Sequence, residues 1–401
     1  MEKYSSYKDS GVKWLGEIPS HWEVKRLASF FTERRTKVSD QDYAPLSVTK
    51  NGIFPQLENV AKSNDGDNRK LVLNGDFVIN SRSDRKGSSG VSDYDGSVSL
   101  INIVLEPRKT VVPKFCNYLL KSRAFIEEYY RNGRGIVADL WTTRYDEMKM
   151  IKIPMPSLKE QESITSYLDS VTTQIDTAIF QQQKMIELLN ERKQIIINNA
   201  VTKGLDPNVK MKDSGVDWIG EIPEGWEVRK LKHFAKLQSG DTINSDRFTE
   251  YGYPVYGGNG FREVYTDRYT NDGEYVLIGR QGALCGNVNY AKGQFFASEH
   301  AVVVYPHKEE NLIWLGEVIR ASNLNQYSQS AAQPGLAVGL IQNIYYPYPT
   351  TEEKEKIALF IEKNIQNIDR AISNCNTQIS LLQERKLIII NEVVTGKVKV
   401  S

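Results

Sequence analysis

The feature that most constrains the fold is a pattern that the chain contains twice. The segment Lys8–Val24 returns almost unchanged as Lys212–Val228, and the segment Pro156–Thr202 returns as Pro349–Thr395. A repeat on this scale predicts two similar structural units in succession. The length of 401 residues agrees with two or three domains, because it exceeds what one hydrophobic core usually organises.

Between these landmarks the two copies have diverged, but a common skeleton remains. Gly75–Arg82 parallels Gly273–Arg280, and in both copies an apolar run enters a polar, glycine-rich loop. Ser99–Pro107 likewise parallels Ser298–Pro306, and both runs are rich in β-formers and closed by proline. We therefore expect two similar α/β globular heads with different surfaces. The expected domains are head 1 (1–155), a first helical spacer (156–205), head 2 (206–348) and a second helical spacer (349–401).

The closing segment of each copy is predicted to be one long helix. Each starts with a proline, then Ser157 or Thr350 as N-cap and Glu160 or Glu353 to complete a capping box. Apolar residues recur in alternating steps of three and four, which is the seam of a coiled coil. The seam positions are Ile164, Leu168, Thr172, Ile175, Ile179, Gln182, Ile186, Leu189, Lys193 and Ile196 in copy one, and Ile357, Ile361, Ile365, Ile368, Ile372, Cys375, Ile379, Leu382, Lys386 and Ile389 in copy two. We expect an α+β fold, in which two similar α/β heads are separated by two long antiparallel coiled-coil helices with a pseudo-two-fold internal repeat.

Composition excludes several classes of protein. The 51 Lys and Arg nearly balance the 50 Asp and Glu, so no field of the whole molecule attracts nucleic acid, and a DNA role has to depend on local patches or partner subunits. Three isolated cysteines without a CxxC spacing argue against a zinc site or a disulfide framework and favour the cytoplasm. No secretory signal and no apolar run long enough to span a membrane is found.

Motifs of catalysis and of cofactor binding are missing from the sequence. There is no Asn/Asp-Pro-Pro-Tyr/Phe of an amino-methyltransferase, no phosphate-binding P-loop and no set of nuclease acids with a lysine. Glu299-His300 could suggest a ligand or a base, but it falls where a buried strand is expected, so we interpret His300 as a satisfied core or loop histidine. We expect no enzyme activity, no catalytic residue, no metal site and no cofactor in this chain.

The ordered double set of motifs resembles the specificity subunit of type I restriction-modification systems. The resemblance is carried by Trp-x-Gly-Glu-Ile-Pro-x-x-Trp at the start of each copy and by Pro-x-x-x-Glu-[Gln/Lys] at the start of each helix, and it covers essentially the whole chain. It implies that the heads are target-recognition domains, each for one half of a bipartite site in double-stranded DNA. It also implies two methyltransferase (modification) subunits, which carry S-adenosylmethionine, and restriction (motor-nuclease) subunits in the larger assembly.

The loops that follow the matched strands supply the candidate DNA-binding residues. Arginine can bind guanine, and glutamine can bind adenine, through two hydrogen bonds each in the major groove. The alternative for every candidate is a solvated turn or an ion pair within the domain. The candidates are Arg82, Ser83, Arg85, Lys86, Arg131 and Arg134 in head 1, and Tyr256, Asn259, Arg280, Gln281 and Gln333 in head 2.

The sequence is also compatible with two other functions, and it leaves the role of one repeated helix motif open. The chain could be a coiled-coil scaffold whose heads bind ligands other than DNA, or a nuclease with an unrecognised active site. The motif Glu-Arg-Lys-x-Ile-Ile-Ile-Asn, at Glu191–Asn198 and Glu384–Asn391, is either a solvated helix face or a docking surface for a partner.

Overall fold

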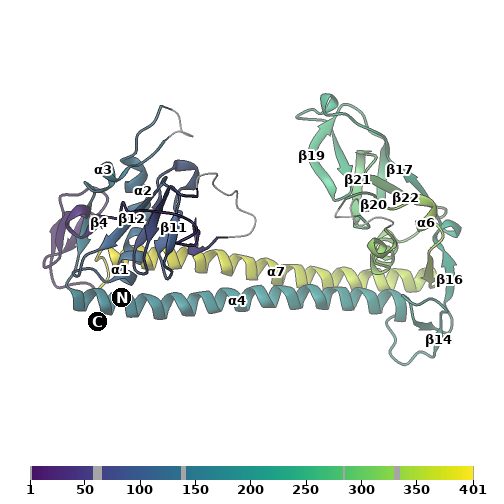
Figure 1. The fold of residues 1–401 in the computed structure, drawn as a ribbon. Coiled ribbons are helices and arrows are strands. Elements are labelled where there is room, and N and C mark those ends of the chain that lie inside the picture. Colours follow the sequence, from purple (N-terminus) through teal and green to yellow (C-terminus); the bar gives the residue numbers. More distant parts are fainter. Residues whose placement is uncertain (1, 57–65, 137–140, 283–284, 329–334, 401) are drawn as a thin grey trace. The chain divides into compact units, whose positions relative to one another are not determined.

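The computed structural model describes residues 2–56, 66–136, 141–282, 285–328 and 335–400. The chain divides into two compact units, which we call unit 1 (Met1–Gln182 and Thr377–Ser401) and unit 2 (Gln183–Asn376). Each unit holds one head, the first half of the helix that follows this head and the second half of the helix that follows the other head (Figure 1). The long helices are therefore shared between the units.

Unit 1 is built from short strands and three short helices around head 1. Its strands are β1 (Tyr7–Asp9), β2 (Glu17–Pro19), β3 (Glu23–Arg26), β4 (Phe31–Glu33), β5 (Lys37–Val38), β6 (Leu46–Thr49), β7 (Gly52–Pro55), β8 (Arg69–Val72), β9 (Phe77–Asn80), β10 (Ser89–Val91), β11 (Gly96–Val98), β12 (Asn102–Pro107) and β13 (Lys152–Met155). Its helices are α1 (Pro113–Leu120), α2 (Arg123–Arg131) and α3 (Tyr145–Met148), with 3-10 helices η1 (Leu27–Ser29) and η2 (Ser83–Arg85).

Unit 2 repeats this arrangement around head 2. Its strands are β14 (Met211–Asp213), β15 (Glu221–Pro223), β16 (Glu227–Lys230), β17 (Ala235–Ser239), β18 (Tyr253–Gly257), β19 (Gly260–Thr266), β20 (Asn271–Gly279), β21 (Val288–Ala297), β22 (Ala301–Pro306) and β23 (Tyr345–Tyr348). Its helices are α5 (Leu312–Ala321) and α6 (Val338–Ile341), with 3-10 helices η4 (Leu231–His233), η5 (Ser245–Arg247) and η6 (Leu324–Tyr327). The shared helices are α4 (Leu158–Lys203) and α7 (Thr351–Val394).

The two heads are built on the same sheet, as the repeat predicts. Strand order is β10-β9-β12-β4 in head 1, and the matching strands of head 2 occur in the order β21-β20-β22-β17. In both, the strand before the arginine loop pairs antiparallel with the proline-closed strand, for example Val78 with Val104 and Val276 with Val304. Helix α1 packs on β9 and β10, and α5 packs on β20 and β21. The expectation of two similar mixed α/β heads is confirmed.

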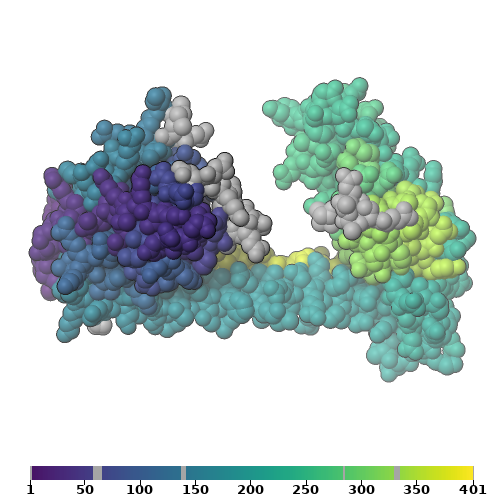
Figure 2. Space-filling view, viewed as in Figure 1, coloured from purple at the N-terminus to yellow at the C-terminus, as the bar shows by residue number. Residues whose placement is uncertain are grey.

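The heads differ in what is added to this sheet. Head 1 carries a separate three-stranded sheet, β11-β8-β5, and the hairpin β6–β7. In head 2 the hairpin β18–β19 instead joins the main sheet, because β18 pairs parallel with β21. Within unit 2 this hairpin lies at the side of the head away from α7 (Figures 1 and 2). The additions follow the stretches where the two sequences no longer match, so a common scaffold supports two different outer surfaces.

The predicted seam positions of both helices lie inside the helix pairs. All ten positions in each helix are buried or half-buried. In unit 1 the Lys386 Nζ lies 2.7 Å from an oxygen of Asp176, and in unit 2 the Lys193 Nζ lies 2.8 Å from an oxygen of Asp369. These pairs occupy matching positions of the repeat, so each seam lysine binds an aspartate on the other copy's helix. The two long helices therefore pack together in both units.

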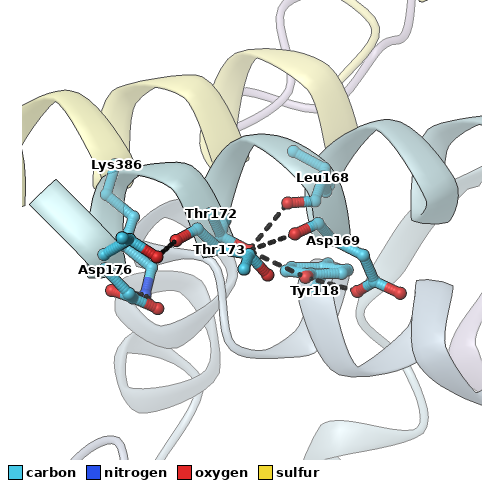
Figure 3. A network of polar contacts seen from close by, with 8 residues as sticks. Tyr118, Leu168, Asp169, Thr172, Thr173, Asp176 and Lys386 are labelled. Atoms are coloured by element: carbon cyan, nitrogen blue, oxygen red, sulfur yellow. Dashed lines mark hydrogen bonds and ion pairs between the residues drawn. The ribbon is translucent and has the colours of Figure 1, made fainter.

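In unit 1, polar contacts join head 1 to α4, the helix that follows it (Figure 3). The hydroxyl of Tyr118 on α1 donates to Asp169 Oδ1 at 2.7 Å and lies 3.3 Å from Thr172 Oγ1. Burial, together with the hydrogen bond to Asp169, raises the pKa of Tyr118 to about 12, which keeps the hydroxyl a donor at neutral pH. Asp176 lies one turn beyond Thr172 on α4, where it binds Lys386 of α7 (Figure 3).

The matched tryptophans and glutamates join the start of each copy to the start of its helix. Trp22 Nε1 donates to Glu160 at 3.0 Å, and Trp226 Nε1 donates to Glu353 at 2.9 Å. The capping box of α7 is complete, since Thr350 and Glu353 bond each other's backbone N–H groups at 3.3 and 3.0 Å. At α4 only half of the predicted box forms, because the Glu160 carboxylate accepts from Tyr4, His21 and Trp22 instead.

Candidate nucleic-acid interface

The matched arginines Arg82 and Arg280 follow equivalent strands of the two heads. Arg82 lies two residues after the last residue of β9, and Arg280 comes directly after β20. Their backbones are tightly held. Arg82 donates its N–H to Asn80 Oδ1 at 3.0 Å, and its carbonyl accepts from the Tyr130 hydroxyl at 3.1 Å. Arg280 donates its N–H to the His300 carbonyl at 2.9 Å, and its own carbonyl accepts from the Leu336 N–H at 2.9 Å. The sheet therefore fixes the point from which each guanidinium extends.

Neither of these guanidinium groups forms an ion pair with a carboxylate of the described residues. Arg82 is exposed and Arg280 is half-buried. A guanidinium carries five donors and is always charged. One without a carboxylate partner, in a loop at the end of a strand, is therefore available for an external acceptor. A free arginine at the same position of both heads is the strongest sign of a binding function in this region.

The remaining basic candidates of head 1 are each paired with a nearby carboxylate. The N···O distances are 3.6 Å for Arg85 with Asp84, 2.7 Å for Lys86 with Glu127, 2.5 Å for Arg131 with Glu128 and 3.3 Å for Arg134 with Glu147. Such exposed pairs typically contribute about 0 to 1 kcal/mol. Exchange of a carboxylate for a phosphate would therefore cost little, but the structure does not set these residues apart as it does Arg82.

A second loop meets the arginine loop in each head. In head 1 Thr142 forms isolated β-bridges with both Arg82 and Arg134, and in head 2 Gln281 forms one with Gly335. Ser83 is half-buried and donates its N–H to the Trp141 carbonyl at 3.1 Å. The structure thus brings the loop of residues 82–86 and the loop of Arg134 together, although they are far apart in the sequence.

Tyr256 and Asn259, two other candidates of head 2, lie around the β18–β19 turn. Asn259 is in the turn, and its Oδ1 accepts from Asn287 Nδ2 at 3.2 Å. Tyr256 is half-buried, with its ring 5.3 Å from that of Phe295 and 6.1 Å from that of Phe261, so most of its ring surface serves packing. Gln333 lies outside the described residues.

His300 and Glu299 lie beside the candidate Gln281, although sequence reasoning did not count them among the candidate DNA-binding residues. The expectation of a buried strand at this point is wrong, because residues 299 and 300 form the turn between β21 and β22. In this turn His300 Nδ1 lies 3.1 Å from Gln281 Oε1, and His300 Nε2 lies 3.2 Å from Glu299 Oε1. The adjacent acid and histidine were the available signal, but only the fold shows that Gln281 is their neighbour.

Neither metal binding nor membrane insertion is indicated in the part of the chain that the structure describes. No group of three or more His, Cys, Asp or Glu side chains is arranged to hold a metal ion there. No helix there is long and apolar enough to cross a bilayer.

Comparison with protein families gives one match, and it covers both copies of the repeat. The model of the type I restriction modification DNA specificity domain matches residues 19–188 and again residues 223–379. The two matches begin near the ends of the repeated N-terminal segments and extend into the long helices. The internal repeat is therefore a repeat of this domain.

Individual relatives agree with the family match. The chain is 42% identical over 158 residues to the EcoprrI specificity subunit of Escherichia coli, which covers 37% of this chain and 39% of that protein. It is 25% identical to the putative MjaX specificity subunit of Methanocaldococcus jannaschii over 98% of both chains. This second match extends along the entire two-copy architecture.

Two solved structures have a similar fold. One belongs to a study of complex assembly and conformational transition of the type I R-M system, with a TM-score of 0.72, 15% identity and coverage of 94% of this chain and 98% of that chain. The other is the HsdS subunit from Thermoanaerobacter tengcongensis, with a TM-score of 0.53, 16% identity and coverage of 95% and 98%. At these identities the likeness concerns the fold alone.

Proposed function

Because the chain belongs to the type I restriction modification DNA specificity family, we propose that each of its heads reads one half of a bipartite site in double-stranded DNA. The observation that carries this proposal is an arginine, Arg82 or Arg280, that follows equivalent strands in two heads whose surfaces have otherwise diverged and that has no carboxylate partner among the described residues. A shared position with different neighbours suits two readers of different half-sites. Nothing in the family match favours a scaffold whose heads bind ligands other than DNA.

The rest of the assembly follows from the same proposal. The long helices form an antiparallel coiled coil that sets the spacing between the half-sites. The chain itself is non-catalytic, and adenine methylation is carried out in the cytoplasm by two partner methyltransferase subunits that hold S-adenosylmethionine. Restriction subunits join in the larger assembly. The near-neutral charge of the chain supports this division, because tight binding to phosphates then has to come in part from the partners.

Methylome sequencing of the host tests the proposed function directly. We expect one bipartite motif with methyladenine in both halves, which disappears when the gene for this chain is deleted and returns when it is restored. The purified chain alone should neither methylate nor cleave DNA. Persistence of every methyladenine motif after deletion, or methyl transfer by the chain alone, would contradict the proposal.

The arginines should act on separate halves of the site. Arg280→Ala should weaken discrimination in one half-site, and Arg82→Ala in the other, each by about 1 to 3 kcal/mol, because a two-point contact with guanine is lost. The measurement is selection from DNA libraries by the complex with its methyltransferase subunits. Arg131→Ala, which removes a residue already paired with Glu128, is the matched control. Equal weakening for all DNA sequences would make the arginines phosphate contacts instead.

A docking surface for the methyltransferase subunits is supported by exposed aliphatic residues on the long helices. Leu188 and Ile195 are 51% and 52% exposed in unit 2, and their repeat counterparts Leu381 and Ile388 are 58% and 48% exposed in unit 1. Each pair is spaced by one heptad and so lies on one helix face. We call these two faces the outer aliphatic pairs. Their presence at the same place in both copies suits a partner that binds twice.

Introducing a charge into an outer aliphatic pair should release one methyltransferase subunit. Burial of a leucine contributes about 1.5 to 3 kcal/mol, and a buried unpaired carboxylate adds a further penalty. Leu188→Glu or Leu381→Glu should therefore leave one subunit bound, and the double variant none, as measured by mass in solution. Asn190→Glu and Gln383→Glu are matched controls, since two residues further along turn the side chain by about 200° around the helix. Unchanged assembly in the double variant would place docking elsewhere.

A further inference from the structure

The inference concerns how head 2 distinguishes bases, and it rests on the proposed function. Gln281 is exposed and follows the arginine at the end of β20. The side chain of its neighbour His300 is 44% exposed and that of Glu299 is 31% exposed. The three side chains form one line of contacts, from the Gln281 amide to Nδ1 of the imidazole, and from Nε2 of the imidazole to the Glu299 carboxylate, at 3.1 and 3.2 Å.

The backbone holds this line in place from two sides. The N–H of Arg280 donates to the His300 carbonyl, and the turn of residues 298–301 is closed by the Ala301 N–H, which donates to the Ser298 carbonyl, both at 2.9 Å. The β18–β19 turn lies against the same place. A Cβ on Gly258 would be 3.4 Å from the His300 carbonyl oxygen and 3.5 Å from that of Gln281. The backbones that carry the imidazole and the amide are therefore held close to each other.

Hydrogen-bond chemistry links the proton on His300 to the orientation of Gln281. Nε2 of His300 lies 3.2 Å from Glu299 Oε1, and because a carboxylate only accepts, a hydrogen on Nε2 is favoured there. If Nδ1 also carries one, it donates to the amide oxygen, and Gln281 turns its NH₂ group outward. If Nδ1 is bare, it accepts from the amide NH₂, and Gln281 turns its oxygen outward. The two amide orientations have nearly the same shape, so the histidine partner decides between them.

The structure has the first arrangement, with Gln281 Oε1 facing Nδ1. The second carboxylate oxygen of Glu299 is buried and has no hydrogen-bond partner among the described residues. Other charged groups on the packed segments are Arg280, Asp241, which forms a bridge at Ser298, and Arg262 beside Gly257.

We propose that His300, oriented by Glu299, is a positioning residue that sets which end of the Gln281 amide faces a base of the second half-site. At the edge of the major groove, guanine and thymine present a keto oxygen where adenine and cytosine present an amino group. An outward NH₂ therefore selects a keto base, and an outward oxygen selects an amino base.

The test is a selection from DNA randomised in both half-sites, made with the complete methyltransferase complex. One position of the second half-site should prefer guanine or thymine, because the Gln281 NH₂ group faces outward, and His300→Ala should reduce this preference by about tenfold. The first half-site is the internal control and should not change. Neighbouring positions of the second half-site should keep their preference in His300→Ala.

Further variants show whether His300 acts through Gln281. Gln281→Ala should affect the same position, and the double variant His300→Ala/Gln281→Ala should be no worse than Gln281→Ala alone. Glu299→Gln should weaken the preference at the same position, because an amide can accept from or donate to Nε2 and so no longer orients the imidazole. His307→Ala, whose ring contacts the Lys232 carbonyl at 3.1 Å, is the matched control and should leave the profile unchanged.

The outcomes separate this inference from the proposed function. If the wild-type complex selects no second half-site at all, the proposed function of head 2 is wrong. If it selects one, but His300→Ala leaves every position unchanged, only the inference is overturned. A uniform loss of binding across all positions in His300→Ala also overturns it, because a purely structural histidine gives that result.

Discussion

Replacing Lys354 by alanine is expected to lower the free energy of unfolding of unit 2 by about 3 to 5 kcal/mol. The substitution leaves the buried carboxylate of Glu310 without its cationic partner. The Lys354 side chain is 2% exposed, and its Nζ lies 2.7 Å from Glu310, whose side chain is 6% exposed. The ammonium also lies 3.4 Å from the ring centre of Tyr348 and 4.4 Å from that of Trp314. Two aromatic faces and one carboxylate thus surround a single cation.

In the first copy of the repeat, the position equivalent to Lys354 holds an uncharged residue. The position that matches Lys354 is Gln161, which is fully buried and bonds the backbone of Thr110, Val112 and Pro156 at 2.8 to 3.0 Å. In unit 2, burial lowers the pKa of Lys354 despite its contact with Glu310, so the ion pair does not fully offset the cost of removing the charge from water. Replacing both partners, as in Lys354→Met/Glu310→Met, should therefore be close to neutral or stabilising.

Native-state hydrogen exchange measures this effect unit by unit. In Lys354→Ala, amides of α5 and β23 should exchange faster by about two to four orders of magnitude, while amides of head 1 stay unchanged. Lys356→Ala is the matched control on the same helix, because its pair with Glu352 is 63% and 77% exposed and should contribute about 0 to 1 kcal/mol. Equal effects of Lys354→Ala and Lys356→Ala would show that burial of the pair does not matter.

Lengthening both long helices is expected to change the preferred spacer between the half-sites. The boundary between the units crosses α4 after Gln182 and α7 after Asn376, so insertions there leave the contacts of each head with its own helices in place. Four residues add about 6 Å to a helix, and one base pair spans about 3.4 Å of duplex. The spacer should therefore grow by one or two base pairs, while both half-sites stay the same.

Randomised-spacer selection on paired insertions decides whether the helices set this distance. A four-residue insertion in α4 alone shifts its seam against α7, so a matching insertion near Cys375 should be needed for full stability. Seven residues keep the heptad and should add about 10 Å, or about three base pairs. A folded, active double insertion that retains the original spacer would show that the helices do not set the distance.

The sequence predicted the scaffold well because its signals are local or repeated. The seam of three- and four-residue steps is a property of one helix, and all ten predicted positions in each helix are buried or half-buried. The matching sequence runs that end at Arg82 and Arg280 predicted equivalent strands. These strands, β9 and β20, occupy equivalent places in the sheets of the two heads. The capping box failed only at α4, where the Glu160 carboxylate also accepts from Tyr4 and His21, residues more than a hundred positions away.

The candidate site was predicted less completely, because the availability of a side chain depends on its neighbours in space. Arg82 and Arg85 are close in sequence and alike in chemistry, but Arg85 has a carboxylate partner and Arg82 has none among the described residues. Tyr256 is at a plausible turn, but its ring packs on Phe295. His300 was expected in a buried strand, and it lies in a turn beside Gln281. No spacing rule reports these contacts.

The sequence by itself determined that the chain is a tandem of two similar units, where its long helices begin and which of their faces pack, because these properties depend on intervals of a few residues or on internal identity. Only the tertiary structure decided which charged groups are paired, free or buried. Lys354 and Glu310 are 44 positions apart and meet because α5 and α7 pack in one unit. A contact of this kind depends on the path of the whole chain, and it determines whether a charge stabilises the fold or remains available to bind.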